Sequence, residues 1–190
     1  MIILASQSPR RREILEKMGL EFRVCPAEIG EKAEERDPRR YVLRLAGRKA
    51  LWVWLKHKSD TVIAADTVVC LGSRIMGKPK DREEAFFMLK SLSGKRHHVY
   101  TGVYVISKGR IRHFCEDTAV YFREISDGLI REYVESGEPM DKAGAYGAQG
   151  AGGRFVSRIE GDFYNVMGLP MCSLSCVLEE LGVMSGGNAG

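Results

Sequence analysis

Apolar positions follow two different patterns along the chain, and the patterns alternate. Residues 2–5 form an apolar run, and residues 61–71 are rich in Val, Ile and Ala without alternation, a pattern typical of strands covered on both faces. Between such runs the apolar residues recur every three or four positions, which favours helices. Strands that alternate with helices predict a mixed α/β domain.

Capping residues place the element boundaries. Ser8 and Pro9 suit the start of a helix that Gly19 ends, and Asp37 precedes a helix that runs past Trp54. Asp81 begins a third helix, which reaches Leu92. The remaining pattern predicts strands at 21–25, 99–107, 111–122 and 155–159, a turn at 108–109, and helices at 126–137 and 170–181.

Residues 138–153 are rich in glycine and poor in periodic apolar residues, and such a loop inside a compact domain usually has a function. We find no internal repeat and no domain linker. Residues 1–184 are therefore predicted to form a single domain, and residues 185–190 a disordered tail.

Composition narrows the class of protein. A chain of 190 residues with 44% hydrophobic and 28% charged residues is typical of one globular domain, with room for two lobes. The net charge of +4 is too small to require a nucleic-acid partner, but it suits a pocket that attracts phosphates.

The five cysteines are scattered, which favours buried, reduced thiols in a cytosolic protein over disulfides or a metal site. No segment resembles a signal peptide, and none approaches the roughly 20 apolar residues that span a bilayer. We therefore expect a cytoplasmic protein with no membrane partner.

The first candidate for chemistry is the predicted strand-to-helix junction at residues 6–12, which carries two serines and three arginines. A helix amino terminus attracts anions, and arginine binds phosphate through two hydrogen bonds. A solvated basic first turn is the alternative, but positive charge there opposes the helix dipole. We therefore favour a phosphate site.

The second candidate is Asp66, which lies in the middle of an apolar strand. A carboxylate there is costly to bury unless it is paired, hydrogen-bonded or bound to a metal. Glu31 and Lys49 are candidates for a second carboxylate and a cation, although the sequence does not place them beside Asp66.

The third candidate is the glycine-rich loop, because glycine lets a backbone approach a ligand and the amide of Gln149 both donates and accepts. A flexible surface loop explains the same residues equally well. By contrast, residues 72–79 only imitate a phosphate-binding loop: Pro79 stands where the motif needs a hydroxyl, although Lys78 remains a candidate phosphate ligand.

Five blocks, in this order and spacing, resemble the Maf family over nearly the whole chain: residues 6–11 (SQSPRR), 65–69 (ADTVV), 77–79 (GKP), 141–150 (DKAGAYGAQG) and 161–170 (GDFYNVMGLP). The resemblance implies a two-lobed, mixed-sheet α/β fold akin to the inosine triphosphate pyrophosphatases. It also implies a homodimer, a nucleoside triphosphate substrate in the cleft between the lobes, and a divalent metal, Mg²⁺ or Mn²⁺.

The resemblance also implies roles for individual positions. Asp66 matches the proton acceptor that activates water, and Glu31 and Asp66 match the metal ligands. The substrate-specificity positions are Arg10, Thr67 and Gln149. The phosphate-binding positions are Ser6, Arg11, Lys49 and Lys78. Arg12 lies outside the family pattern and receives no role.

The family resemblance predicts hydrolysis of dTTP and UTP to the monophosphate and pyrophosphate, which removes unwanted nucleotides from the pool. Thr67 and the loop around Gln149 are similar to this branch, and the branch that acts on 7-methyl-GTP differs there. Three alternatives are hydrolysis of 7-methyl-GTP, a nucleotide-binding regulator of cell division and septum formation, and a nucleic-acid binder that uses residues 10–12 and 36–40. The last lacks interleaved aromatic residues and ranks lowest.

Overall fold

The computed structural model describes residues 1–30 and 34–184, and in these ranges it contains seven strands, six α-helices and three short 3₁₀ helices. The tail predicted at 185–190 lies outside the described residues. In chain order the elements are β1 (Ile2–Leu4), α1 (Pro9–Lys17), β2 (Phe22–Val24), α2 (Pro38–Lys56), β3 (Thr61–Leu71), β4 (Arg74–Met76), α3 (Arg82–Leu92), β5 (Arg96–Ser107), β6 (Arg110–Phe122), α4 (Asp127–Glu135), η1 (Glu138–Asp141), η2 (Ala143–Ala145), η3 (Ala151–Phe155), β7 (Val156–Glu160), α5 (Phe163–Met167) and α6 (Met171–Glu180).

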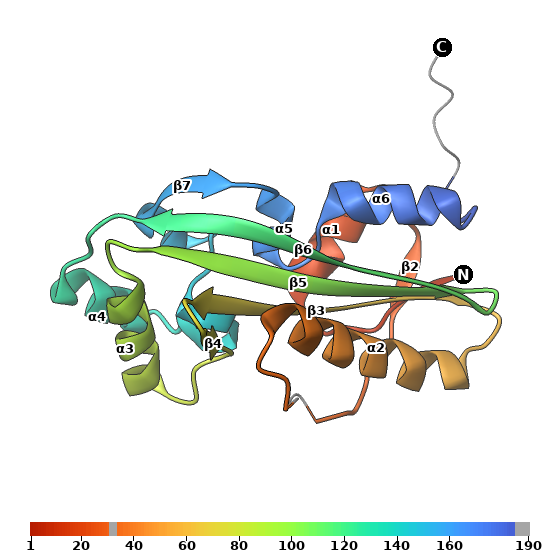
Figure 1. The fold of residues 1–190 in the computed structure, drawn as a ribbon, viewed down its shortest axis with the longest axis horizontal. Helices are drawn as coiled ribbons and strands as arrows, with labels where there is room; N and C mark the ends of the chain where they lie inside the picture. The colour runs from red at the N-terminus through yellow and green to blue at the C-terminus, as the bar shows by residue number, and fades with distance from the viewer. Residues whose placement is uncertain (31–33, 185–190) are drawn as a thin grey trace, which may run out of the picture. The chain divides into compact units, whose positions relative to one another are not determined.

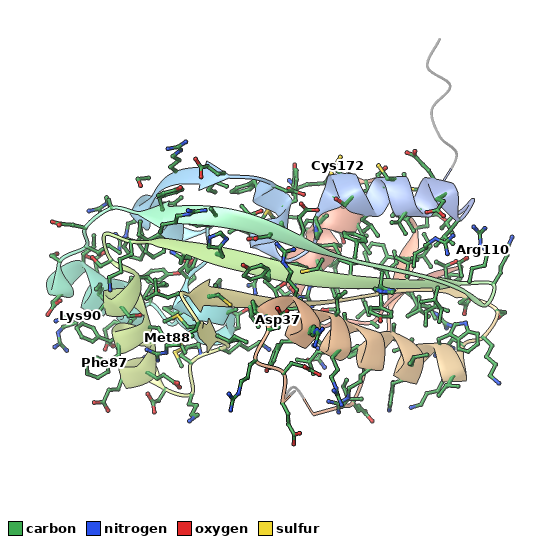
Figure 2. The ribbon with its side chains drawn as sticks, viewed as in Figure 1. Asp37, Phe87, Met88, Lys90, Arg110 and Cys172 are labelled. Atoms are coloured by element: carbon green, nitrogen blue, oxygen red, sulfur yellow. The ribbon has the colours of Figure 1, made fainter. Side chains whose placement is uncertain are left out.

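The caps predicted from sequence set the helix boundaries. Gly19 has a φ of 68° just after α1, where the N–H groups of residues 19 and 20 bond back to the last turn of the helix. The carboxylate of Asp37, labelled in Figure 2, accepts the N–H of Arg40 (2.9 Å) at the start of α2. Asp81 accepts the N–H of Glu84 (2.7 Å) and begins α3 in the same way.

Three features differ from the prediction. The short elements β4 and α5 were not predicted, because three to five residues carry too little periodicity to be recognised. Residues 138–153 are not an irregular loop but contain η1, η2 and the start of η3. None of the five cysteines forms a disulfide, but only Cys70 is buried: Cys25 and Cys115 are partly exposed and Cys172 and Cys176 are exposed, so the prediction of burial is wrong for the last two and only partly met for Cys25 and Cys115.

The strands pair in the order β2-β1-β3-β5-β6-β7, and β4 also pairs with β3. β1 runs parallel to β2 and β3, whereas the β3–β4 and β6–β7 pairs are antiparallel, so the sheet is mixed as predicted. A strand rather than a helix follows the turn at Gly72, and α3 begins only at Arg82. This arrangement agrees with the rejection of a phosphate-binding loop in this segment.

The chain divides into two compact units, and β3, β5 and β6 contribute to both. Unit 1 consists of residues 1–66, 101–115 and 168–190. In unit 1, α2 lies on one face of the strands, and α1 and α6 lie on the other (Figure 1). Ile3, Val53, Val62 and Ile106 form part of the core between α2 and the strands.

Unit 2 consists of residues 67–100 and 116–167. Its core contains buried side chains from both helices and strands, including Leu89 of α3, Ile130 of α4 and Val120 of β6. Figure 1 shows α3 and α4 side by side in this unit. Within the described part of the chain, no helix is both long and apolar enough to cross a membrane.

Candidate active site

Asp66 and Lys49 form a buried ion pair in unit 1. Asp66 lies in β3, where its residue is 9% exposed, and Lys49 projects from α2 and is 8% exposed. The Nζ of Lys49 donates to Oδ1 of Asp66 at 2.7 Å. A buried charge requires a partner, because both ions lose their hydration. The structure thus confirms that Asp66 is partnered and identifies Lys49 as the cation, which the sequence left open.

The strand-to-helix junction at residues 6–12 begins beside β3. The N–H of Ala5 donates to the carbonyl of Ile63 (2.8 Å), so the chain leaves β1 next to the stretch of β3 that leads to Asp66. This is the carboxyl end of β1 and of the part of β3 that pairs with it, and α/β proteins commonly bind ligands at the carboxyl ends of parallel strands. Pro9 occupies the first turn of α1, and Ser8 is the N-cap residue although its side chain does not bond the helix.

Arg11 and Ser6 contact each other and the protein. The guanidinium of Arg11, a residue only 9% exposed, donates from Nε to the carbonyl of Gly168 (2.8 Å) and from Nη1 to Oγ of Ser6 (3.1 Å). Oγ of Ser6 also accepts the N–H of Ser8 (3.2 Å). These bonds fix the shape of the junction. Arg10 is more exposed than Arg11, and Arg12 is exposed.

Three of the five sequence blocks meet at Gly144 in unit 2. The N–H of Gly144 donates to the carbonyl of Gly77 (3.0 Å), next to Lys78. A Cβ on Gly144 would lie 2.7 Å from Cγ2 of Val69, and its φ of 68° also favours glycine. The ADTVV strand, the GKP turn and the glycine-rich loop are therefore held together. Lys78 is exposed, and Thr67 is half-buried.

The loop that carries Gln149 is built around Glu138, with Gln149 itself exposed. Oε2 of Glu138 accepts the N–H of Ala151 (3.1 Å), and Oε1 accepts the hydroxyl of Tyr133 (2.9 Å). The same Tyr133 hydroxyl accepts the N–H of Gly147 (3.1 Å). The sequence left open whether the glycines of this loop admit a ligand or belong to a flexible surface loop; in the structure Gly150 lies against Glu138 and Gly152 against Tyr133.

Asn165 and His97 are two further buried polar residues that the sequence did not reveal. Nδ2 of Asn165 donates to the carbonyl of Val99 and to Oγ1 of Thr118, both at 3.0 Å. Nε2 of His97 and the hydroxyl of Tyr146 lie 2.9 Å apart in a hydrogen bond. Burial lowers the pKa of His97 to about 4, so the ring is neutral at pH 7. Only the position of Asn165 within a family block gave a signal.

The predicted residues are divided between the units as follows. Unit 1 contains Ser6, Arg10, Arg11, Lys49 and Asp66, and unit 2 contains Thr67, Lys78 and Gln149. Glu31, predicted as a metal ligand, lies outside the described residues. Among the residues that are described, no group of three or more His, Cys, Asp or Glu side chains gathers as a metal site.

These features define an α/β protein of mixed sheet, with a buried Asp–Lys pair on β3 just beyond the parallel pairing of this strand with β1. Its fold is similar to that of a solved structure titled "The structure of the Staphylococcus aureus Ham1 protein", with a TM-score of 0.53 and 16% identity over 94% of this chain and 98% of that one. At this identity the likeness concerns the fold alone.

The chain belongs to the Maf family: the model described as "Maf-like protein" matches residues 1–181. A relative from Thermococcus kodakarensis is 51% identical, covering 96% of this chain and 97% of its own length. One from Aquifex aeolicus is 49% identical and covers 97% of each chain, and one from Pyrococcus furiosus is 50% identical and covers 94% of each. All three relatives are named dTTP/UTP pyrophosphatase.

Proposed function

We propose that this chain hydrolyses dTTP and UTP to the nucleoside monophosphate and pyrophosphate, and so clears these nucleotides from the pool. The observation that carries the proposal is the buried Lys49–Asp66 pair, in a chain about half identical over its whole length to three dTTP/UTP pyrophosphatases. The relatives' names favour this substrate class over 7-methyl-GTP and over a purely regulatory role.

In the proposed mechanism Asp66 is the general base. Its carboxylate accepts a proton from the attacking water, and Lys49 holds the carboxylate in place through the 2.7 Å bond to Oδ1. The water oxygen then forms a bond to the α-phosphorus. The bond between that phosphorus and the oxygen that bridges to the β-phosphate breaks, and pyrophosphate leaves with the bridging oxygen. No covalent enzyme intermediate is required.

Cations on the chain balance the charge of the triphosphate. We propose that Arg10 and Lys78, which are more exposed than Arg11, contact the phosphates and stabilise the leaving pyrophosphate. Arg11 and Ser6 act on the same phosphates by shaping the junction, because their side chains bond each other and Arg11 also bonds the carbonyl of Gly168. Gln149, with Thr67 and Arg10, selects the base.

We propose that a divalent cation, Mg²⁺ or Mn²⁺, binds to Asp66 and to Glu31, which lies outside the described residues. Mg²⁺ commonly binds through one or two protein carboxylates together with substrate phosphates. Such an ion would neutralise phosphate charge and lower the pKa of water. A chelator is expected to stop turnover, and added Mg²⁺ or Mn²⁺ to restore it.

Asp66→Asn tests the mechanism, because the amide has nearly the same shape but cannot accept the proton. We expect pyrophosphate release from UTP to fall by about 10²-fold or more, while circular dichroism shows a folded protein. The matched control is Asp60→Asn, which changes the partly buried aspartate just before β3, in the same unit, that pairs with Arg23 and the amino terminus. Near-normal turnover by Asp66→Asn would remove this residue from the mechanism.

We also propose that residues 1–184 form one catalytic domain and that the protein acts as a homodimer in the cytoplasm. Light scattering of the purified chain measures the oligomeric state directly. A mass of one chain, about 21.2 kDa, at assay concentration would contradict the dimer.

A further inference from the structure

Hydrogen bonds to the side chains of Tyr133 and Glu138 hold both sides of the turn that carries Gln149. On its amino-terminal side, the N–H of Gly147 donates to the hydroxyl of Tyr133 (3.1 Å). On its carboxyl-terminal side, the N–H groups of Ala151 and Gly152 donate to the carboxylate of Glu138, at 3.1 and 3.4 Å. The Tyr133 hydroxyl donates to that same carboxylate. Glu138 therefore holds one side of the turn directly and the other side through Tyr133.

Two glycines lie where the turn packs against Glu138 and Tyr133. A Cβ on Gly150 would collide with the Glu138 carboxylate, and one on Gly152 would lie 2.7 Å from the Tyr133 hydroxyl. At Gly152 the Cβ would also lie 2.9 Å from the backbone oxygen of Gly147, so the turn needs glycine there. At Gly150 the Cβ would displace the end of the Glu138 side chain from the amides whose hydrogen bonds it accepts. Glycine at these two places therefore lets the turn lie against the half-buried Glu138 carboxylate.

The chemistry of the two side chains suits a fixed arrangement. An ionised carboxylate only accepts hydrogen bonds, and three donors, two amides and one phenol, point at Glu138. Burial raises the pKa of Tyr133, with the neighbouring Glu138 charge acting in the same direction, so the phenol keeps its proton and remains a donor. Bonds to a charged acceptor are about twice as strong as neutral ones.

We propose that Glu138 and Tyr133 are positioning residues that set base selectivity, by holding the 147–152 turn so that the Gln149 amide has one orientation. This inference rests on the proposed function, in which Gln149 reads the base. Neither side chain needs to touch the substrate. The bonds to the turn already restrict Gln149, and pre-organised groups discriminate better than mobile ones.

Glu138→Gln is the principal test. It replaces one acceptor oxygen of the carboxylate by an NH₂ group, which cannot accept the N–H groups of the turn. We expect the ratio of kcat/KM for UTP to kcat/KM for GTP to fall about tenfold, through loss of activity on UTP. Tyr133→Phe should lower the same ratio by a smaller factor, because it removes only the bond to Gly147 and one of the bonds to Glu138. The matched control is Glu135→Gln, which removes an exposed carboxylate paired with Arg82 and should leave the ratio unchanged.

A double-mutant cycle with Gln149→Leu separates positioning from general loss of structure. If Glu138 acts through Gln149, Glu138→Gln has no further effect on the ratio once Gln149 is Leu. An unchanged ratio in the single variant, equal losses on UTP and GTP, or additive effects in the cycle would each overturn the proposal.

Hydrogen exchange of the amides at 147, 151 and 152 provides a readout that does not depend on activity, and exchange should be faster in folded Glu138→Gln than in the wild type. Unchanged exchange would also overturn the proposal. Wild-type activity on UTP is measured in parallel: if it is absent, the proposed function fails, whereas normal wild-type turnover with an unchanged ratio in the variants refutes only the positioning role.

Discussion

At the residue scale, the sequence showed which positions carry chemistry better than it showed their partners. Asp66 is conspicuous as the one charge within an apolar strand, and the structure confirms that it is buried and paired. Its partner, Lys49, lies 17 positions away, and this pairing depends on how α2 packs. The sequence contains no local signal for such a contact.

The two arginines at the start of α1 illustrate the same point. Adjacent guanidinium groups are indistinguishable in sequence, yet Arg11 is buried and bonded to Ser6 and Gly168, whereas Arg10 is more exposed. The third arginine, Arg12, is exposed as well and still has no assigned role. Helical geometry directs successive side chains about 100° apart, so each of the three has its own environment.

Gln149→Leu tests the reading of the base at the residue scale. Uracil and thymine present an N–H between two carbonyls, and an amide can donate to one carbonyl while accepting from that N–H. An unpaired polar group costs about 1–3 kcal/mol, so kcat/KM for UTP and dTTP should fall roughly tenfold or more, with ATP and GTP changed much less. Equal losses on all substrates would assign Gln149 to the phosphates or to the shape of the loop.

At the element scale, long periodic segments were predictable and short ones were not. The strand at 61–71 and the helix from Asp37 were predicted nearly to the residue, because apolar pattern and capping agree. β4, with three residues, and α5, with five, form because neighbouring parts of the fold stabilise them. The regular structure of residues 138–153 was not predicted. Hydrogen bonds to Glu138 and Tyr133 hold this segment, and such bonds leave no periodic pattern in the sequence.

Gly102→Ala tests the packing of α2 on β5 in unit 1. A Cβ at this position would lie 2.7 Å from the backbone of both Val42 and Leu43, which cannot rotate away as a side chain could. We expect the free energy of unfolding to fall by about 1–3 kcal/mol, as in other overpacked cores, measured by denaturant titration.

The matched control for this substitution is Gly128→Ala in α4, where a Cβ meets nothing within 4 Å. Alanine is the better helix former, so the control should be neutral or stabilising by up to about 1 kcal/mol. A stable Gly102→Ala variant would show that the helix can move outward at little cost.

At the scale of the whole molecule, His97 links the stability of the fold to pH. Its ring is 1% exposed and its pKa is lowered from the ordinary 6.5 to about 4, chiefly by burial. Between these values the unfolded chain binds a proton that the folded chain does not. As a result, the titration of His97 leaves the free energy of unfolding unchanged above pH 6.5 and lowers it as the pH falls from 6.5 toward 4.

The comparison of wild type with His97→Gln measures this linkage. Between pH 7 and pH 5, the wild type should lose about 2 kcal/mol more of its unfolding free energy than the variant, in which the titrating ring is absent. Guanidinium titrations at both pH values provide the measurement. Equal losses in the two proteins would show that His97 already titrates normally in the fold.

The family and the mixed α/β class were predictable because five sequence blocks and a long apolar strand extend over the whole chain. The arrangement of the blocks in space was not, since the contacts of Gly144 with Gly77 and Val69 join segments about 70 positions apart. The central claim that remains to be measured is therefore chemical: that this chain selects pyrimidine triphosphates and cuts them to release pyrophosphate.

The most direct test is kcat/KM for UTP, dTTP, CTP, GTP and ATP on the wild-type protein, with pyrophosphate and the monophosphate both quantified. We predict that UTP and dTTP exceed ATP and GTP by about tenfold or more, with one pyrophosphate released per monophosphate. Higher kcat/KM for ATP or GTP, or release of orthophosphate in place of pyrophosphate, would contradict the account.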